Sequence, residues 1–159
     1  MMANMKSKIG LILIIAVVLI CIPITVPRFF GYEAYSITSG SMEPEIATGS
    51  VVYAKNVVPE EVAVGDVIVF YGGADGTAVT THRVVDNDAG NGQFITKGDA
   101  NAGNDMQPVP YGSLLGRVEK SIPMLGMIFP VLADAKGKVY LLCILIAGVI
   151  LRVLGSRQE

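Results

Sequence analysis

IGLILIIAVVLICIPITV, residues 9–26, is an uncharged run of 18 residues near the start of the chain. As an α-helix it would be about 27 Å long, close to the hydrocarbon thickness of a bilayer. Lys6 and Lys8 precede the run, and Arg28 follows it. A cleaved signal peptide has a shorter apolar centre and a small-x-small cleavage site, and the site is absent here. The run therefore predicts a retained transmembrane helix over residues 9–27.

A second uncharged run of 13 residues lies at residues 139–151. It is short for a membrane span, but Val153 and Leu154 extend it if the Arg152 side chain reaches the membrane interface. An uninterrupted apolar run cannot form an amphipathic interfacial helix. A buried core helix remains an alternative. We expect a second transmembrane helix over residues 139–155.

Basic residues indicate how the two helices are oriented. Two lysines precede the first run, and Arg152 and Arg157 end the second. Residues 1–8 and 156–159 are therefore predicted to be cytoplasmic. Residues 27–138 carry eight Lys/Arg and thirteen Asp/Glu, and we expect them on the extracytoplasmic side.

The segment at residues 122–138 leads into the second run. It is apolar up to Ala133, but Pro123 and Pro130 interrupt it. Because proline removes a helical hydrogen bond, a regular helix throughout is not expected. The segment is expected either to lie at the membrane surface or to pack against the core.

Composition excludes several classes of protein and site. The 159 residues are 52% hydrophobic and 16% charged, with a net charge of −2 and no basic run, which argues against a nucleic-acid binder. Cys21 and Cys143 lie inside the apolar runs, so no disulfide or cysteine-bound metal is expected between them. His82 is the only histidine, which excludes a multi-histidine metal site. No metal or organic cofactor is expected.

Between the runs, short β-branched and aromatic segments alternate with turn residues. These segments lie at residues 50–54, 67–71, 79–85, 93–96 and 114–118. Such segments, separated by Gly, Asn and Asp, are typical of antiparallel strands. We therefore expect a mainly β fold, in which a small antiparallel β domain over residues 28–121 is flanked by an N-terminal and a C-terminal transmembrane helix.

Three segments of this domain carry chemically useful residues. Ser39-Gly40-Ser41-Met42-Glu43-Pro44 places two hydroxyls in a tight turn. His82 can accept a proton at neutral pH, and the loop 96–105 holds Asp99 and Asp105. Each feature alone is typical of an ordinary surface turn, a strand histidine or a solvated loop. Together they supply a nucleophile, a base and an orienting carboxylate, which activation of a serine requires.

Four motifs occur in one order along the chain. They are Ser39-Gly40-Ser41-Met42-Glu43-Pro44, Gly65-Asp66-Val67-Ile68-Val69-Phe70, His82-Arg83-Val84-Val85 and Thr96-Lys97-Gly98-Asp99-Ala100-Asn101. In this order they resemble type I signal peptidases of the ER-type branch, which is found in archaea, some Gram-positive bacteria and eukaryotes. The resemblance covers about half of the chain. It implies a membrane-bound serine endopeptidase that removes signal peptides from exported preproteins.

The resemblance also implies a role for each matching residue. Ser41 matches the nucleophile, and His82 stands where the bacterial type carries a catalytic lysine. Asp105 matches the acid usually assigned to the triad, while Asp99 matches a second aspartate that matters in the family. Ser39 matches a hydroxyl that helps to bind the oxyanion. Which aspartate orients the histidine stays open.

Two residues of the fourth motif complicate this interpretation. Lys97 is a rival base, since a desolvated lysine can accept a proton near neutral pH. In the family, however, its motif accompanies the histidine. Ala100 is a departure, because many eukaryotic members have Asn at this position, which is not a catalytic one.

A function of another class also fits the sequence, namely a membrane-anchored, non-enzymatic β domain that binds or scaffolds. The expected partners are signal-peptide-bearing preproteins and the lipid membrane, and no nucleic acid. Partner subunits stay open, since eukaryotic relatives work in a complex while many prokaryotic ones act alone. The small size and the absence of an Asn-x-Ser/Thr site favour an integral protein of a prokaryotic cell membrane, with the ER membrane as the alternative.

Overall fold

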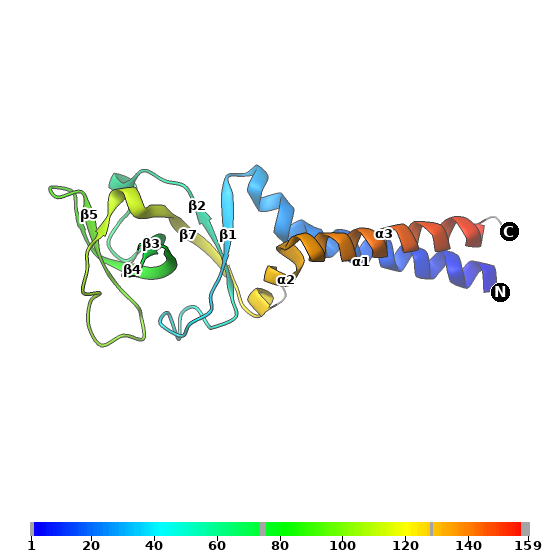
Figure 1. The fold of residues 1–159 in the computed structure, drawn as a ribbon, viewed down its shortest axis with the longest axis horizontal. Helices are drawn as coiled ribbons and strands as arrows, with labels where there is room; N and C mark the ends of the chain where they lie inside the picture. Colours follow the sequence, from blue (N-terminus) through cyan, green and yellow to red (C-terminus); the bar gives the residue numbers. More distant parts are fainter. Residues whose placement is uncertain (1, 74–75, 128, 157–159) are drawn as a thin grey trace. The chain divides into compact units, whose positions relative to one another are not determined.

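The structure is a computed structural model that describes residues 2–73, 76–127 and 129–156. Its contacts divide the chain into two units (Figure 1). The helical unit comprises residues 2–27 and 129–156, and the β unit comprises residues 28–127. Arg157 and the rest of the expected cytoplasmic tail after Ser156 lie outside the described residues.

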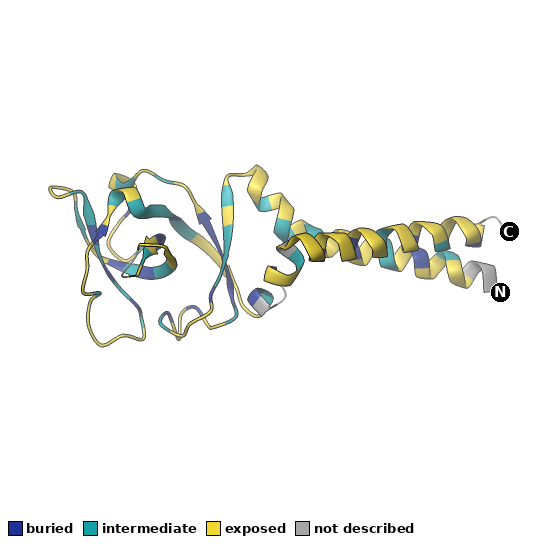
Figure 2. Cartoon of the chain, in the orientation of Figure 1, coloured by how far each residue is buried: buried dark blue, intermediate teal, exposed yellow. Residues whose placement is uncertain are grey.

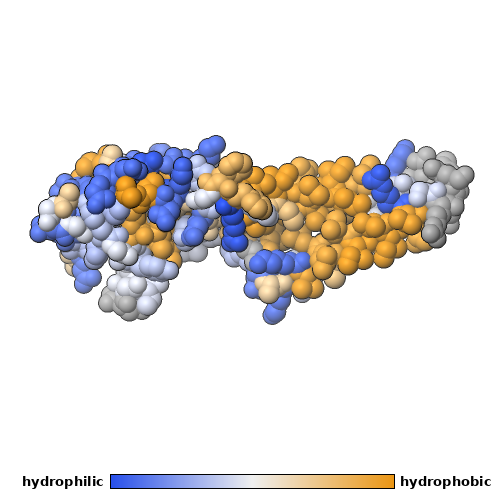
Figure 3. Space-filling view, turned by 90° about the horizontal axis from the view of Figure 1, so that it is seen from above, coloured by the Kyte–Doolittle hydropathy of each residue, from blue (hydrophilic) through white to orange (hydrophobic). Residues whose placement is uncertain are grey.

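The helical unit contains the long helices α1 (Met2–Phe29) and α3 (Ala135–Ser156) and the short helix α2 (Phe129–Ala133). At 1.5 Å per residue, α1 is about 42 Å long and α3 about 33 Å long, so each exceeds the hydrocarbon core of a bilayer. In each helix, 11% of the most apolar stretch is buried. Most of the other residues along both helices are exposed (Figure 2), and the surface of the helical unit is largely hydrophobic (Figure 3). Both helices are therefore long and apolar enough to cross a membrane.

Both long helices extend beyond the apolar runs that predict them. α1 continues through Pro23 and Pro27, and α3 begins at Ala135. Ala and Lys at the start of α3 have high helix propensity, and an existing helix extends more easily than a new one forms. The segment at residues 122–138 is divided among several elements. It contains the end of strand β7 at Ile122, a 3-10 turn at Leu125–Met127, α2 and the start of α3.

Two glycines mark a close approach between α1 and α3. A Cβ on Gly10 would lie 2.5 Å from the carbonyl oxygen of Gly148, and a Cβ on Gly148 would lie 3.1 Å from the carbonyl oxygen of Gly10. Val17 on α1 and Leu141 on α3 are buried. Small residues let two helix backbones pack closely, which favours their association within a membrane. Gly10 and Gly148 therefore hold α1 and α3 together as a helix pair.

Replacing Gly10 by Leu should weaken this pair by about 1–3 kcal/mol, because the new side chain would collide with the backbone of α3. The measurement is the unfolding midpoint of the chain in detergent, followed by circular dichroism. Ile12→Leu is the matched control, since Ile12 lies on the same helix and is 64% exposed. Equal midpoints for the two variants would contradict the close approach of the helices.

The β unit is built on one antiparallel sheet. Within the described residues its strands follow the order β1-β2-β7-β3-β4-β5-β6. The strands are β1 (Tyr32–Ser36), β2 (Val51–Lys55), β3 (Val67–Gly72), β4 (Ala78–Asp88), β5 (Gln93–Lys97), β6 (Val109–Pro110) and β7 (Leu114–Ile122). The predicted antiparallel arrangement is thus confirmed.

Strand β3 lies between two apolar clusters. Its side chains point alternately to the two faces of the sheet. Val67 and Val69 pack in one cluster, while Ile68 and Phe70 pack in the other. The second cluster also contains Val84 of the neighbouring strand β4. Because both faces of β3 are covered, the β3–β4 pair is a firm support for side chains carried on β4.

The expectation of a mainly β fold is only partly correct, since 40% of the residues are helical and 29% lie in strands. The helices exceed the apolar runs, which accounts for the excess. Two strands, β1 and β6, were not among the predicted segments. β1 carries Glu33 and is only partly buried, and β6 consists of two residues, one of which is Pro110. Neither has the run of β-branched residues that predicts a strand.

Candidate active site

Ser41 lies in the tight turn that follows β1. The amide of Glu43 donates to the carbonyl of Gly40 (3.0 Å), and the amide of Ile46 donates to the carbonyl of Met42 (2.8 Å). Met42 is 1% exposed and belongs to the first apolar cluster. The buried Met42 therefore anchors the turn, while the preceding serine stays accessible.

The Glu43 side chain also stabilises the turn that carries Ser41. Its carboxylate accepts hydrogen bonds from the Thr48 hydroxyl (2.8 Å) and the Thr48 amide (3.2 Å). These two donors lower the pKa of Glu43, because they stabilise the ionised carboxylate. The turn that carries Ser41 is thus tied to the chain that leads into β2.

His82 lies on β4 and contacts a carboxylate through one ring nitrogen. Its Nδ1 lies 2.6 Å from Oδ2 of Asp105. That oxygen also accepts a hydrogen bond from the Thr96 hydroxyl (2.7 Å), and the Asp105 amide donates to the Thr96 carbonyl (2.8 Å). Thr96 is fully buried and His82 is 9% exposed. The carboxylate is therefore held in place before any reaction begins, and the other nitrogen, Nε2, is free of this contact.

Gly98 joins the Ser41 turn to the histidine. The Ala100 amide donates to the carbonyl of Ser41 (2.9 Å). A Cβ on Gly98 would lie 2.7 Å from that carbonyl oxygen and 3.0 Å from Nε2 of His82. Only glycine fits at this position without displacing a neighbour. Nε2, the nitrogen that would accept the serine proton, thus lies on the side of the ring that faces the Ser41 turn.

Asp99 makes a different contact from Asp105. It forms a two-point pair with Arg83, whose Nε and Nη2 donate to its carboxylate at 2.8 and 2.6 Å. Arg83 also donates to the carbonyl of Gly65 (2.8 Å). Hydrogen bonding to Asp99 raises the pKa of Arg83, so the guanidinium stays charged. Asp99 therefore ties the loop after β5 to β4 and to the turn before β3.

Lys97 lies on the opposite face of the sheet from His82. In the β4–β5 ladder, Lys97 is paired with Arg83, and Thr96 is paired with Val84. Since neighbouring residues on a strand point to opposite faces, Lys97 shares the face of Arg83, while Thr96 shares the face of His82. The sheet thus separates Lys97 from the His82–Asp105 contact.

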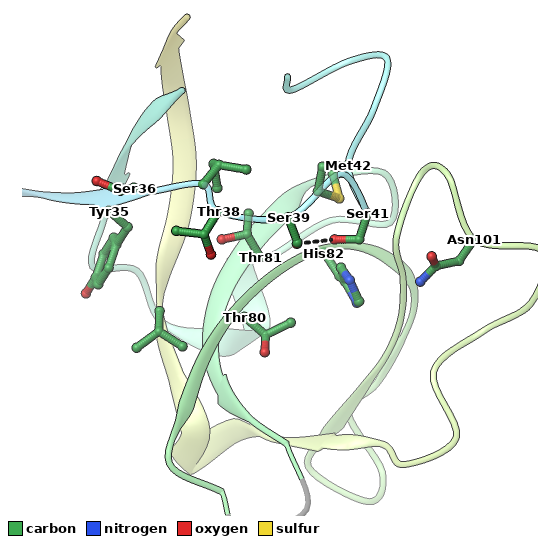
Figure 4. A pocket seen from close by; sticks show the side chains of 12 residues that line it. Tyr35, Ser36, Thr38, Ser39, Ser41, Met42, Thr80, Thr81, His82 and Asn101 are labelled. Atoms are coloured by element: carbon green, nitrogen blue, oxygen red, sulfur yellow. Dashed lines mark hydrogen bonds between the residues drawn. The ribbon is translucent and has the colours of Figure 1, made fainter. Parts of the chain in front are cut away.

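Ser39 completes the group of expected site residues. Its hydroxyl oxygen lies 3.3 Å from that of Ser41, and its side chain is exposed. Both serines line a cleft of about 480 Å³ together with His82 and Asn101 (Figure 4). The structure therefore brings Ser39, Ser41 and His82 to one cleft.

Two residues of this region were not expected from the sequence. Thr96 orients Asp105, although the fourth motif offered no reason to give it a role. Asn101 lines the cleft, although it stands in the fourth motif without an assigned role. The Thr96 role depends on how the loop between Thr96 and Asp105 folds back on itself, and the Asn101 role on a cleft formed with Ser41 and His82, which spacing alone does not reveal. Among the described residues, no group of three His, Cys, Asp or Glu side chains could hold a metal ion.

Comparison with known families gives one match to more than half of the chain. Residues 8–95 match the family described as signal peptidase, peptidase S26. The chain belongs to the signal peptidase S26 family. The match includes the motifs that carry Ser41 and His82 and ends before the loop that carries Asp99 and Asp105.

This member of the signal peptidase family is also similar to individual proteins of known name. It is 44% identical over 86 residues to signal peptidase I W of Bacillus subtilis. The aligned region covers 52% of this chain and 44% of that protein. It is 31% identical over 128 residues to the signal peptidase complex catalytic subunit SEC11C of Homo sapiens. The aligned region covers 73% of this chain and 66% of that protein. The chain thus spans less than two thirds of the length of these relatives.

If the chain cleaves signal peptides as its family does, replacing Gly98 by Ala should lower kcat/KM for a peptide that spans a signal-peptide cleavage site by about ten- to a hundredfold, because the methyl group would displace Ser41 and His82. Gly103→Ala is the matched control in the same loop, since a Cβ there would meet nothing within 4 Å. Both variants are assayed in detergent with an internally quenched peptide. Equal activity of the two would show that the tight contact at Gly98 is not needed.

Proposed function

We propose that the chain is a membrane-anchored serine endopeptidase that cleaves signal peptides from preproteins. In this proposal Ser41 is the nucleophile, His82 the general base and Asp105 the orienting acid. The observation that carries it is the 2.6 Å contact between His82 and Asp105, at a cleft that Ser41 also lines. Membership of the signal peptidase family supports the same reaction.

The proton path follows from the roles of the two imidazole nitrogens. The Asp105 carboxylate accepts the Nδ1 proton, which leaves a lone pair on Nε2. Nε2 takes the proton of the Ser41 hydroxyl as its oxygen attacks the scissile carbonyl carbon. The adjacent carboxylate stabilises the imidazolium that forms. Because His82 is 9% exposed, little water screens this charge pair.

The oxyanion formed by the attack needs hydrogen-bond donors. In the proposal these are the Ser41 amide and the Ser39 hydroxyl, whose oxygen lies 3.3 Å from that of Ser41. One such donor typically contributes about 2.7–4 kcal/mol to the transition state. The imidazolium then gives its proton to the leaving amine, and the C–N bond breaks. Water, deprotonated by His82, releases the acyl segment from Ser41.

Two open strand edges offer a place for an extended substrate. Within the described residues, β1 pairs with β2 alone, and β5 pairs with β4 only from Arg83 onward. The part of β4 before His82 thus has one free edge, and so does β1. Tyr35 to Thr38 and Val79 to Thr81 line the cleft. An extended peptide can satisfy such edges with main-chain hydrogen bonds. In this proposal the cleft favours small side chains at positions −1 and −3 of the substrate.

The two apolar helices are the proposed membrane anchor. The signal segment of a preprotein also lies in the membrane, so anchoring enzyme and substrate raises their effective concentration. Lys6, Lys8 and Arg152 favour cytoplasmic termini and a catalytic domain on the extracytoplasmic side of a prokaryotic cell membrane. The similarity to a Bacillus relative supports this location. The name of the SEC11C relatives, a catalytic subunit of a complex, supports partner subunits as well.

Ser41→Ala should abolish cleavage of a preprotein reconstituted with the enzyme in vesicles, with a loss on the order of 10⁴-fold or more, since no other group takes over the attack. The measurement is the appearance of mature protein on a gel. Ser121→Ala on β7 is the control, because Ser121 does not line the cleft. In the same assay His82→Ala should be inactive and Lys97→Ala active. Equal cleavage by wild type and Ser41→Ala would leave the non-enzymatic binding domain as the better explanation.

The two aspartates should differ in what they change. Asp105→Asn should lower kcat by about 10²–10⁴-fold with a small effect on the unfolding midpoint, because the amide leaves the imidazole in the wrong tautomer. Asp99→Asn should lower the unfolding midpoint and reduce kcat less, because it weakens the pair with Arg83. Steady-state kinetics and thermal unfolding in the same detergent measure both effects. The reverse pattern would make Asp99 the triad acid.

A further inference from the structure

Asn101 occupies a defined place beside the reacting groups. Its amide nitrogen in the backbone donates to the carbonyl of Gly98 (2.9 Å), which closes a tight turn. The side chain folds back over Gly98, because a Cβ on Gly98 would lie 2.7 Å from Nδ2 of Asn101. The same point is 2.7 Å from the Ser41 carbonyl oxygen and 3.0 Å from Nε2 of His82. The side-chain amide of Asn101 therefore lies near the main-chain carbonyl of Ser41 and near Nε2 of His82.

The side-chain amide of Asn101 is available to a bound molecule. The residue is exposed and lines the cleft. Figure 4 shows its amide pointing toward Ser41 and His82. Among the described residues its side chain has no hydrogen-bond partner. An amide offers a donor and an acceptor, which together match the C=O and N–H of an extended main chain.

The position of this amide indicates which part of the substrate it meets. Ser39 and Asn101 lie on opposite sides of Ser41 (Figure 4), and Ser39 is the proposed oxyanion donor. The leaving amine must approach Nε2 of His82, because that nitrogen supplies its proton. Nδ2 of Asn101 and Nε2 of His82 both border the space that a Cβ on Gly98 would occupy, at 2.7 and 3.0 Å from that point. Asn101 therefore lies on the side from which the mature protein leaves.

We propose that the Asn101 side chain binds the main chain of the first residue after the cleavage site. This inference rests on the proposed function and adds to it a contact on the leaving-group side. Since the contact is to the main chain, it does not select a particular side chain at that position. It aligns the leaving nitrogen with His82 and so contributes to cleavage of a peptide bond.

The test compares two substrates with the same acyl segment. One is a peptide that continues past the cleavage site. The other is a p-nitrophenyl ester, which has no residue after the cleavage site. In Asn101→Ala the ratio of kcat/KM for the peptide to kcat/KM for the ester should fall about five- to tenfold, the effect of one neutral hydrogen bond. Asn104→Ala, an exposed residue of the same loop, should leave the ratio unchanged.

The possible outcomes separate this inference from the proposed function. A ratio in Asn101→Ala equal to that of the wild type overturns the inference, even if both rates fall, because a merely structural role changes both substrates alike. A fall in the ratio that Asn104→Ala reproduces also overturns it. If the wild type cleaves neither substrate, the proposed function fails as well.

Discussion

The loop that leaves β5 after Lys97 depends on the hydrogen bonds between Thr96 and Asp105. The backbone bond (2.8 Å) and the bond from the Thr96 hydroxyl (2.7 Å) close the loop at its base. This closure presents the Asp105 carboxylate to His82 and lets Gly98 pass against the Ser41 turn. Because Thr96 is fully buried, the base of the loop belongs to the core. The positions of the residues around the cleft therefore depend on the packing of the sheet.

The proposed catalytic groups differ in how firmly the structure holds them. His82 sits on β4, beside a strand packed on both faces, and its carboxylate partner is braced by Thr96. Ser41 sits in a turn anchored mainly by one buried side chain, Met42. In the proposed mechanism, a rigid base and an accessible nucleophile suit a cleft that receives a long substrate. Preorganised dipoles cost no rearrangement during the reaction, so rigidity is most useful around the histidine.

Much of this architecture could be predicted from the sequence because its signals are local. Apolar runs mark the two long helices, and β-branched segments between turn residues mark five strands. β1 and β6 carry no such signal, since pairing with a neighbour rather than composition makes them strands. The serines, the histidine and the aspartates of the site could also be identified from local motifs in the sequence. The family resemblance implied that Asp105 orients His82, but the residues alone did not place the two side chains in contact, because the contact depends on the register of β4 against β5 and on the turn at Gly98. The role of Thr96 has the same origin.

In the proposed binding mode, a substrate pairs through its main chain with the open edges of β1 and β4. Such pairing does not depend on the substrate sequence, so it selects for an extended conformation. A segment that has already formed its own helix or strand offers no free main-chain groups to these edges. For a substrate bound in this way, cleavage competes in time with folding of the passenger protein. The region around the cut must stay extended until it reaches the cleft. In the proposed binding mode, the open edges therefore require that cleavage precede folding of the substrate.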